Sequence, residues 1–284
     1  MRPASRFPVW DNHFHLDPAG RGKEAVKDFE RAGGTHLLLV HKPYHDLPPG
    51  DLDRTREALE RTVRMAGWVR EAGVVPFLAL APHPAEFTEM LRSGLSLDEA
   101  AATYEASLRL AAAVAQDAGA VALGEIGRPH YPVEPAVWER ANALMDLGLA
   151  LCRDHGLAAI LHTESATPEV FADLAVHVRK AGLPFDKAVK HYSAPLVDPA
   201  LNHGLLPSVI VGKDQAERAI AQGTRFLMET DYMDDPRRPG GVLGPKTVPR
   251  RTFELLEKGL ANESQMRVVH AENPRKAYGV DVAV

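Results

Sequence analysis

The chain has 284 residues, of which 45% are hydrophobic and 25% are charged, as in an ordinary globular protein with a sizeable core. Its formal net charge of -5 excludes the class of nucleic-acid binders that act through a broad basic surface. Bound divalent cations reverse the charge of a site locally, so this exclusion does not extend to metal enzymes.

The single cysteine, Cys152, excludes a disulfide framework and a thiolate metal cluster within the chain. It lies in an apolar helical stretch, which predicts a buried, unreactive thiol. The N-terminal segment MRPASRFPVWD lacks the apolar core of a signal peptide, and no run approaches the ~18 apolar residues of a membrane span. We therefore expect a cytoplasmic protein without a membrane segment. Nothing in the sequence indicates an obligate protein partner, and the oligomeric state stays open.

Short apolar or β-branched runs alternate with longer segments of helical periodicity along the chain. The predicted strands are 8–13, 36–40, 74–81, 120–125, 158–162, 188–191, 208–212 and 226–230. The helices predicted between them include 51–72, 96–118, 135–155, 167–182, 214–222 and 247–260. Asp51, Ser96 and Thr167 are predicted helix N-caps, and Gly156 and Gly182 are predicted helix ends.

Eight such runs, mostly apolar throughout, favour parallel strands that are buried on both faces. Their alternation with helices predicts an α/β fold, a (β/α)₈ TIM barrel forming one domain over residues 1–284. A doubly wound open sheet is the alternative, but the glycine-rich phosphate loop usual after its first strand is missing from the sequence. The Pro/Gly-rich stretch 234–245 follows the eighth strand and is predicted to be an active-site loop.

Residue types that bind metals recur where the predicted strands end. They are His13 and His15 after strand one, Glu125 after strand four, His162 after strand five, His191 after strand six and Asp231 after strand eight. Because the C-terminal ends of barrel strands converge on one mouth, we expect these side chains to lie together. His13 and His15 are two residues apart on a strand, so both imidazoles face the same side.

Four imidazoles and two carboxylates supply nitrogen and oxygen donors, which suit Zn²⁺ best and also Mn²⁺ or Mg²⁺. Six ligands exceed one tetrahedral site that keeps a position for water, so the set predicts two divalent ions bridged by a carboxylate. A hydrogen-bonded structural histidine is the alternative for any one of these positions taken alone. His41 and His83 also follow strands, and the pattern leaves open whether they line the pocket, contact substrate or are ordinary loop histidines.

Several motifs appear in one order along nearly the whole chain. They are WDNHFHLD at 10–17, APHP at 81–84, ALGEIG at 122–127, METDYMDDP at 228–236 and AENPRKAYG at 271–279. In these motifs the sequence resembles the TatD-like metal-dependent hydrolases of the amidohydrolase superfamily. The resemblance implies a binuclear site with one metal on His13, His15 and Asp231, the second on His162 and His191, and Glu125 bridging both. Other branches of the superfamily use a carboxylated lysine at the position of Glu125.

Two departures from the family pattern indicate a divergent subgroup. Family members usually carry an arginine two residues after the fifth-strand histidine, where this chain has Glu164. After GEIG they usually have an apolar residue and an aspartate, where this chain reads Arg128, Pro129 and His130. The Glu164 carboxylate would repel a phosphate unless it turned away or paired with a base such as Arg128. The role of His130 stays open.

The donor set predicts metal-assisted hydrolysis in which Asp231 orients a water and accepts its proton, and the resemblance implies that Glu125 bridges the metals. The resemblance implies a phosphodiesterase or deoxyribonuclease that acts on DNA or a related phosphoester. A lactone, amide or phosphotriester hydrolase on the same metals is the alternative, and a non-catalytic binding protein is disfavoured because all six ligand positions hold competent donors. Five basic residues follow strand eight, and they predict either contacts to phosphate or a solvated face. They are Arg237, Arg238, Lys246, Arg250 and Arg251.

Overall fold

Within residues 7–238 and 242–283, which the computed structural model describes, nine parallel strands form one sheet. The start of the N-terminal segment and residues 239–241 of the loop predicted over 234–245 lie outside these ranges. In order across the sheet, the strands are β8 (Leu227–Glu229), β7 (Leu206–Ile210), β6 (Ala188–Ser193), β5 (Ala158–His162), β4 (Ala122–Gly127), β3 (Val75–Ala79), β2 (His36–Val40), β1 (Trp10–His15) and β9 (Tyr232–Met233).

The two ends of this sheet are joined by only two residues, because Thr230 and Asp231 alone separate β8 from β9. Strand β9 pairs with β1, where Phe14 lies opposite Tyr232. The Asp11 carboxylate on β1 accepts hydrogen bonds from the backbone N–H of Thr230 at 3.0 Å and from its hydroxyl at 2.7 Å. The sheet therefore curls back onto its first strand, and the predicted α/β TIM-barrel fold is confirmed. The ninth strand is a short continuation of the predicted eighth.

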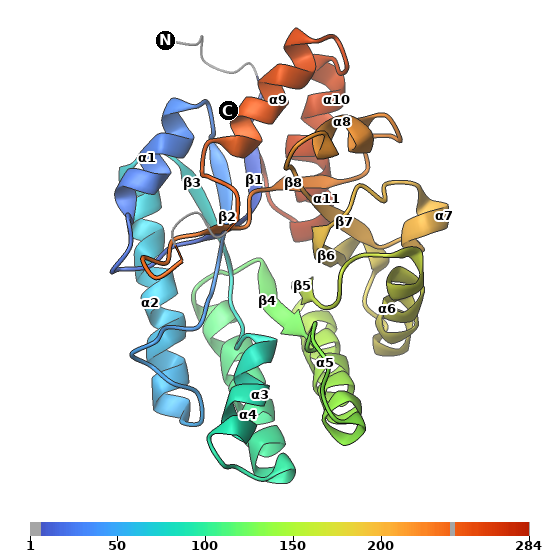
Figure 1. Cartoon of the computed structure of the whole chain (residues 1–284). Coiled ribbons are helices and arrows are strands. Elements are labelled where there is room, and N and C mark those ends of the chain that lie inside the picture. The colour runs from blue at the N-terminus through green and yellow to red at the C-terminus, as the bar shows by residue number, and fades with distance from the viewer. Residues whose placement is uncertain (1–6, 239–241, 284) are drawn as a thin grey trace.

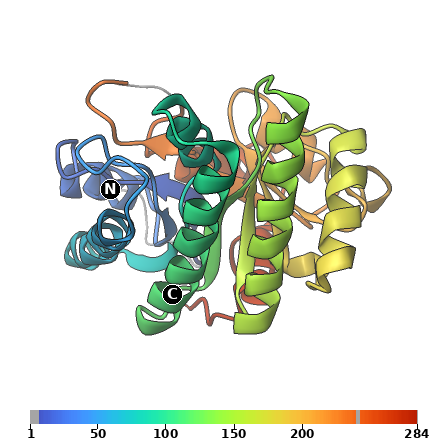
Figure 2. The same cartoon turned by 90° about the horizontal axis from the view of Figure 1, so that it is seen from below.

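Helices surround the strands in Figure 1 and follow them in alternation. In chain order they are α1 (Lys23–Arg31), α2 (Leu52–Glu71), α3 (Pro84–Arg92), α4 (Leu97–Asp117), α5 (Pro135–His155), α6 (Pro168–Ala181), α7 (Pro199–Asn202), α8 (Gln215–Ile220), α9 (Thr247–Glu257), α10 (Glu263–Arg267) and α11 (Asn273–Tyr278). A 3-10 turn, η1 (Phe185–Lys187), precedes β6, and a π-helical turn, η2 (Val268–Glu272), joins α10 to α11. Figure 2 shows α4 and α5, both green, side by side on the outside of the barrel. Along the described chain, no helix is both long and apolar enough to cross a membrane.

The helix boundaries arise from the capping residues that the sequence indicates. Asp51 accepts backbone hydrogen bonds at the start of α2, and Ser96 forms a reciprocal capping box at the start of α4. Thr167 caps α6, whose first residue is a proline. Gly156 and Gly182 end α5 and α6 in the left-handed conformation that favours glycine. These five predicted caps are confirmed.

Apolar side chains from each of β1 to β8 fill the inside of the barrel. They are Trp10, Leu38, Val40, Ala79, Ala122, Ala158, Ile160, Val189, Leu206 and Leu227. Neighbouring residues on the same strands, such as Leu37 and Leu39 on β2, pack outward in the larger core shared with the helices. The barrel interior is therefore a close-packed apolar core. The polar side chains at the strand ends extend from this rigid core.

Candidate metal centre

The structure brings all six predicted ligand side chains together at one end of the barrel. His13 and His15 come from β1, Glu125 from β4, His162 from β5, His191 from β6, and Asp231 from the link between β8 and β9. The two histidines of β1 share a face, as predicted, with their Nε2 atoms 3.0 Å apart. Residues far apart in the sequence thus converge because each ends a strand of one barrel.

One group of donor atoms gathers around His13 and His15. Oδ1 of Asp231 lies 3.5 Å from Nε2 of His15 and 3.9 Å from Nε2 of His13. Nδ1 of His15 lies 2.9 Å from the backbone oxygen of Val40. A neutral His15 ring donates its proton to that carbonyl, so the lone pair on Nε2 faces the cluster, as in a metal ligand.

The Glu125 carboxylate lies between this group and a second one. Its Oε2 atom is 3.7 Å from Nε2 of His13 and 3.8 Å from Nε2 of His15. Its Oε1 atom is 2.8 Å from Nδ1 of His162 and 3.0 Å from Nε2 of His191. Each carboxylate oxygen thus faces a different pair of imidazoles, which is the arrangement that a bridging ligand requires.

The charges of the cluster fit bound cations. Burial raises the pKa of Glu125, but the surrounding histidines, His191 first, outweigh burial and hold that pKa well below its usual range. Among the described residues, no lysine or arginine forms an ion pair with Glu125 or Asp231. Nδ1 of His13 is buried and has no hydrogen-bond partner among the described residues. Ionised carboxylates and imidazoles that lack a basic partner form a donor set for divalent metals.

Sequence reasoning missed Glu229, a fully buried carboxylate on β8. Its Oε1 atom accepts a hydrogen bond from the backbone N–H of Tyr192 at 2.7 Å and lies 3.1 Å from Nδ1 of His191. Burial lowers the pKa of His191, but Glu229 and Glu125 outweigh burial and raise that pKa to about 10. A carboxylate behind a ligating imidazole fixes its orientation and increases its basicity. The sequence did contain a signal, because Glu229 lies within the predicted strand 226–230, two residues before Asp231.

His83 lies beside the cluster, with Nε2 3.6 Å from Oε2 of Glu125. Its Nδ1 accepts a hydrogen bond from the backbone N–H of Ala85 at the start of α3, so Nε2 carries the proton of the neutral ring. Burial lowers the pKa of His83 to about 3, which keeps the ring neutral. His83 is thus a donor aimed at the cluster rather than a ligand.

His41 and His130 take different places. Nδ1 of His41 is 2.9 Å from the hydroxyl of Thr62, and burial lowers the pKa of His41 to about 3, as expected of a structural histidine. Nδ1 of His130 is 2.9 Å from Nε2 of His162, whose other nitrogen faces Glu125. His130 therefore orients a candidate ligand, although it lies in the loop after β4 where spacing alone gives no signal.

Arg128 pairs with the unexpected Glu164 carboxylate. Nε and Nη2 of Arg128 donate to the two oxygens of Glu164 at 2.9 and 3.0 Å. Nη2 also pairs with Asp173 at 2.7 Å, and Nη1 donates to the side chain of Asn142 at 2.8 Å. The guanidinium group lies 4.6 Å from the ring centre of Trp138 and is almost fully buried. Both oxygens of Glu164 therefore face Arg128, which shares its one positive charge between Glu164 and Asp173.

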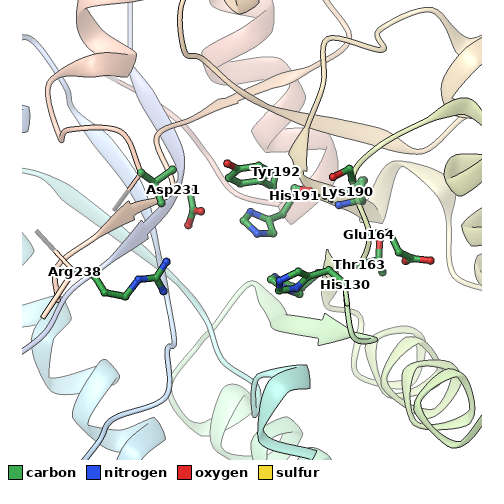
Figure 3. Close-up of a pocket in the computed structure, with 11 residues that line it drawn as sticks. His130, Thr163, Glu164, Lys190, His191, Tyr192, Asp231 and Arg238 are labelled. Carbon is green, nitrogen blue, oxygen red and sulfur yellow. Dashed lines mark hydrogen bonds between the residues drawn. The ribbon is translucent and has the colours of Figure 1, made fainter. Parts of the chain in front are cut away.

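A cavity of about 340 Å³ opens beside the cluster and is lined by His162, His191 and Asp231, among others. Figure 3 shows Arg238 reaching toward it from one side and Lys190 lying on the opposite side. Burial lowers the pKa of Lys190 to about 8, and the nearby carboxylates of Glu229, Glu164 and Glu125 oppose that shift. The cavity thus combines candidate metal ligands with two cationic side chains.

A second, more open hollow of about 550 Å³ adjoins the cavity and shares His130 and Glu164 with it. Its other walls are mainly apolar and include Pro129, Pro132 and Trp138. The cavity beside the candidate ligands is lined mainly by polar residues, and the adjoining hollow is lined mainly by apolar ones.

The basic residues after β8 are mostly engaged elsewhere. Three of them form ion pairs: Arg237 pairs with Asp235, Lys246 with Asp28, and Arg251 with Glu254. Arg250 is exposed on α9, and Arg238 lines the cavity. Most of these basic residues therefore fit the predicted solvated face. Arg238 is the one placed for contact with an anion in the cavity.

Comparisons with known proteins agree with this architecture. The family model described as TatD related DNase matches residues 10–279. An uncharacterized protein from Methanocaldococcus jannaschii is 36% identical over 279 residues, covering 97% of both chains. The structure of YjjV, a TatD homologue from Escherichia coli, has a TM-score of 0.65 and 21% identity, covering 96% of this chain and 98% of that one. The phosphotriesterase homology protein from Escherichia coli was solved with phosphate in its active site. Its structure has a TM-score of 0.60 and 13% identity, covering 96% of this chain and 98% of that one. The chain belongs to the TatD-related DNase family and is a metal-dependent hydrolase.

Proposed function

We propose that this protein hydrolyses phosphodiester bonds, in DNA or in a related phosphoester, with two divalent ions held at the cluster. The observation that carries the proposal is the position of Glu125, whose two oxygens face different pairs of imidazoles. Membership of a DNase family and the two cations lining the cavity support an anionic substrate. Two buried carboxylates and two divalent ions together give the site a positive charge, although the chain carries -5.

The ligands would divide as the donor atoms divide. His13, His15 and Asp231 would hold one ion. His162 and His191, which both face Oε1 of Glu125, would hold the other, and Glu125 would contact both ions. The mixed nitrogen and oxygen set suits Zn²⁺ best, with Mn²⁺ and Mg²⁺ as alternatives. Bound in this way, the ions supply an ionised water at neutral pH and stabilise charge that develops on the phosphoryl group.

Asp231 is the proposed proton acceptor. It lines the cavity and has a φ of 47°, a left-handed conformation that ordinary residues adopt rarely and that is frequent at functional sites. Asp231 would orient the attacking water and accept its proton, while the more deeply enclosed Glu125 positions the ligand groups on either side. His83 directs its Nε2 proton toward the same cluster and would donate to a substrate oxygen there.

A hydrolase of lactones, amides or phosphotriesters is a second candidate for the same ligands. The apolar hollow beside the cavity favours it, because Trp138 and the prolines would accept an uncharged or aromatic portion of a substrate. The organophosphorus hydrolase from Deinococcus radiodurans shares the fold, with a TM-score of 0.58 at 13% identity. Glu164 does not separate the two candidates, because Arg128 pairs with it.

A substrate panel on protein loaded with Zn²⁺ or Mn²⁺ tests the proposal. We expect metal-dependent cleavage of bis-p-nitrophenyl phosphate and single-stranded DNA, and much slower cleavage of simple lactones and paraoxon-like triesters. Asp231→Asn should lower kcat by about 10² or more, because the amide cannot accept the proton. Asp214→Asn is the matched control, since Asp214 also has a left-handed φ, of 59°, but is exposed after β7. Cleavage of lactones or triesters without any phosphodiester cleavage would support the second candidate instead.

A further inference from the structure

Two buried hydrogen-bond donors face the cavity, and the proposed proton transfer uses neither of them. The side chains of Lys190 and Thr163 are 1% and 6% exposed and line the cavity together. Nζ of Lys190 donates to the backbone oxygen of His191 at 2.6 Å, its one hydrogen bond to the described residues. The Thr163 hydroxyl has no hydrogen-bond partner within the described ranges. Figure 3 shows both side chains on the side of the cavity opposite Arg238.

The end of β6 is irregular in a way that brings Lys190 to the cavity. On a regular strand, the consecutive residues Lys190 and His191 would face opposite sides of the sheet. The pairing register between β6 and β7 shifts between Lys190 and Ser193, and Tyr192 has a φ of 52°. With this local distortion, a candidate metal ligand and the neighbouring ammonium group both line one cavity.

The buried ammonium group of Lys190 forms no direct ion pair with the described residues. None of the described carboxylates lies within ion-pair distance of its Nζ, and Arg128 occupies both oxygens of nearby Glu164. An ammonium group has three protons to donate, and only one is used here. The carboxylates of Glu229, Glu164 and Glu125 favour the ammonium form from beyond ion-pair distance, and its two remaining protons have no acceptor among the described residues.

We propose that Lys190 and Thr163 form an oxyanion subsite, which binds an anionic oxygen of the substrate on a phosphate or carboxylate group. The inference rests on the proposed function, because it names how the same cavity recognises its substrate. An ammonium group and a hydroxyl group at one wall both donate to an oxyanion, and charge-assisted hydrogen bonds of this kind are the strong ones. Lys190 is a substrate-binding residue in this scheme, and the proton transfer stays with Asp231.

Calorimetric binding of methylphosphonate to the metal-loaded protein tests the subsite without any need for turnover. Lys190→Met should weaken binding about tenfold or more, since hydrogen bonds from charged groups contribute most. Thr163→Val should weaken it about two- to tenfold, as expected for a neutral donor. Lys213→Met removes an exposed lysine after β7 and is the control for net charge, with wild-type binding expected.

Thermal stability and metal content separate binding from a structural role. Because the Lys190 ammonium group is buried without an ion pair, Lys190→Met should keep or raise Tm and retain the metal content of the wild type. A Lys190 that only positioned His191 would behave differently, since its replacement would release metal or lower Tm. Either of those results, or unchanged methylphosphonate binding in Lys190→Met, would overturn the proposal.

Two substrates distinguish the source of the anion. The dinucleotide of two thymidines has one phosphodiester, and the same dinucleotide with a terminal phosphate adds a second anionic group. If the subsite binds the scissile phosphate, Lys190→Met lowers kcat/KM on both substrates equally. If it binds the second group, the loss occurs only on the phosphorylated dinucleotide. Both results support the subsite. Failure to cleave either dinucleotide, with methylphosphonate binding still dependent on Lys190, would contradict the proposed function and leave the subsite standing.

Discussion

The buried ion pair between Arg128 and Glu164 is the interaction outside the metal cluster whose loss should change stability most clearly. The Arg128 side chain is 3% exposed, whereas those of Glu164 and Asp173 are 30% and 50% exposed. Breaking a fully buried pair costs about 3–5 kcal/mol, because the remaining charge loses its partner. Since Glu164 keeps access to water, we expect Arg128→Met to lower the free energy of unfolding by about 2–4 kcal/mol. That loss corresponds to a decrease in Tm of roughly 3–7 °C for a chain of this size.

A double-mutant cycle isolates the contribution of the pair. Glu164→Met alone should cost less than Arg128→Met, because Asp173 and Asn142 still contact the guanidinium group. The double variant should cost about 1–3 kcal/mol less than the sum of the single variants, since it leaves neither of the two charges without its partner. Unfolding is measured in urea at a fixed excess of metal, because bound metal stabilises the folded state by mass action.

The matched control is the ion pair between Arg140 and Asp98, which has the same 2.7 Å separation as that between Arg128 and Asp173. Its side chains are 41% and 85% exposed, so Arg140→Met should cost about 0.5 kcal/mol or less. Equal losses in Arg128→Met and Arg140→Met, or single-variant losses that simply add in the double variant, would refute the argument that burial makes the Arg128 pair strong.

Three further outcomes follow from the site and the core. Elemental analysis of the metal-loaded protein should find two divalent ions per chain, and replacing both His13 and His15 by alanine should remove at least one; a stoichiometry fixed at zero would contradict the metal centre. Glu229→Gln should weaken metal affinity about 10- to 100-fold in a chelator competition, because the amide no longer supports His191, and an unchanged affinity would contradict that role. Cys152 is fully buried, and burial raises the pKa of its thiol to about 12, so the native protein should not react with a disulfide reagent at pH 8, whereas unfolded protein should. Rapid reaction of the native thiol would show that the core around it opens.

The fold could be predicted because its strands are short apolar runs that differ clearly from the long amphipathic helices between them. The short helices α1, α3, α7, α10 and α11 are not among the predicted helices, since four to nine residues hold few turns, although the six-residue α8 lies within the predicted helix 214–222. Helix α3 also lacks a usual N-cap residue. Its N-cap is His83, whose imidazole forms a capping box with Glu86.

The candidate ligands could be predicted because each one lies near or just after the C-terminal end of a strand, and barrel geometry brings strand ends together without any knowledge of the loops. The side chains that support those ligands could not be found in this way. His130 contacts His162 from a loop, and only the folded chain shows that its ring nitrogen meets the far side of that imidazole. The position of Lys190 could not be predicted for a different reason. A regular β6 would have turned it away from the cavity, and the irregular strand end reverses that expectation.

The charge balance of the site explains how an acidic chain can bind an anion. Arg128 contacts both oxygens of Glu164, and the imidazole of His191 contacts Glu229, so these two carboxylates are engaged by protein groups rather than directed freely at the cavity. Lys190 then faces the cavity without a direct ion pair among the described residues, with Arg238 across from it. The net charge of -5 argues only against recognition through a wide basic surface. Attraction confined to a cavity of about 340 Å³ selects a small anionic group at close range, and the length of any attached polymer contributes little to it.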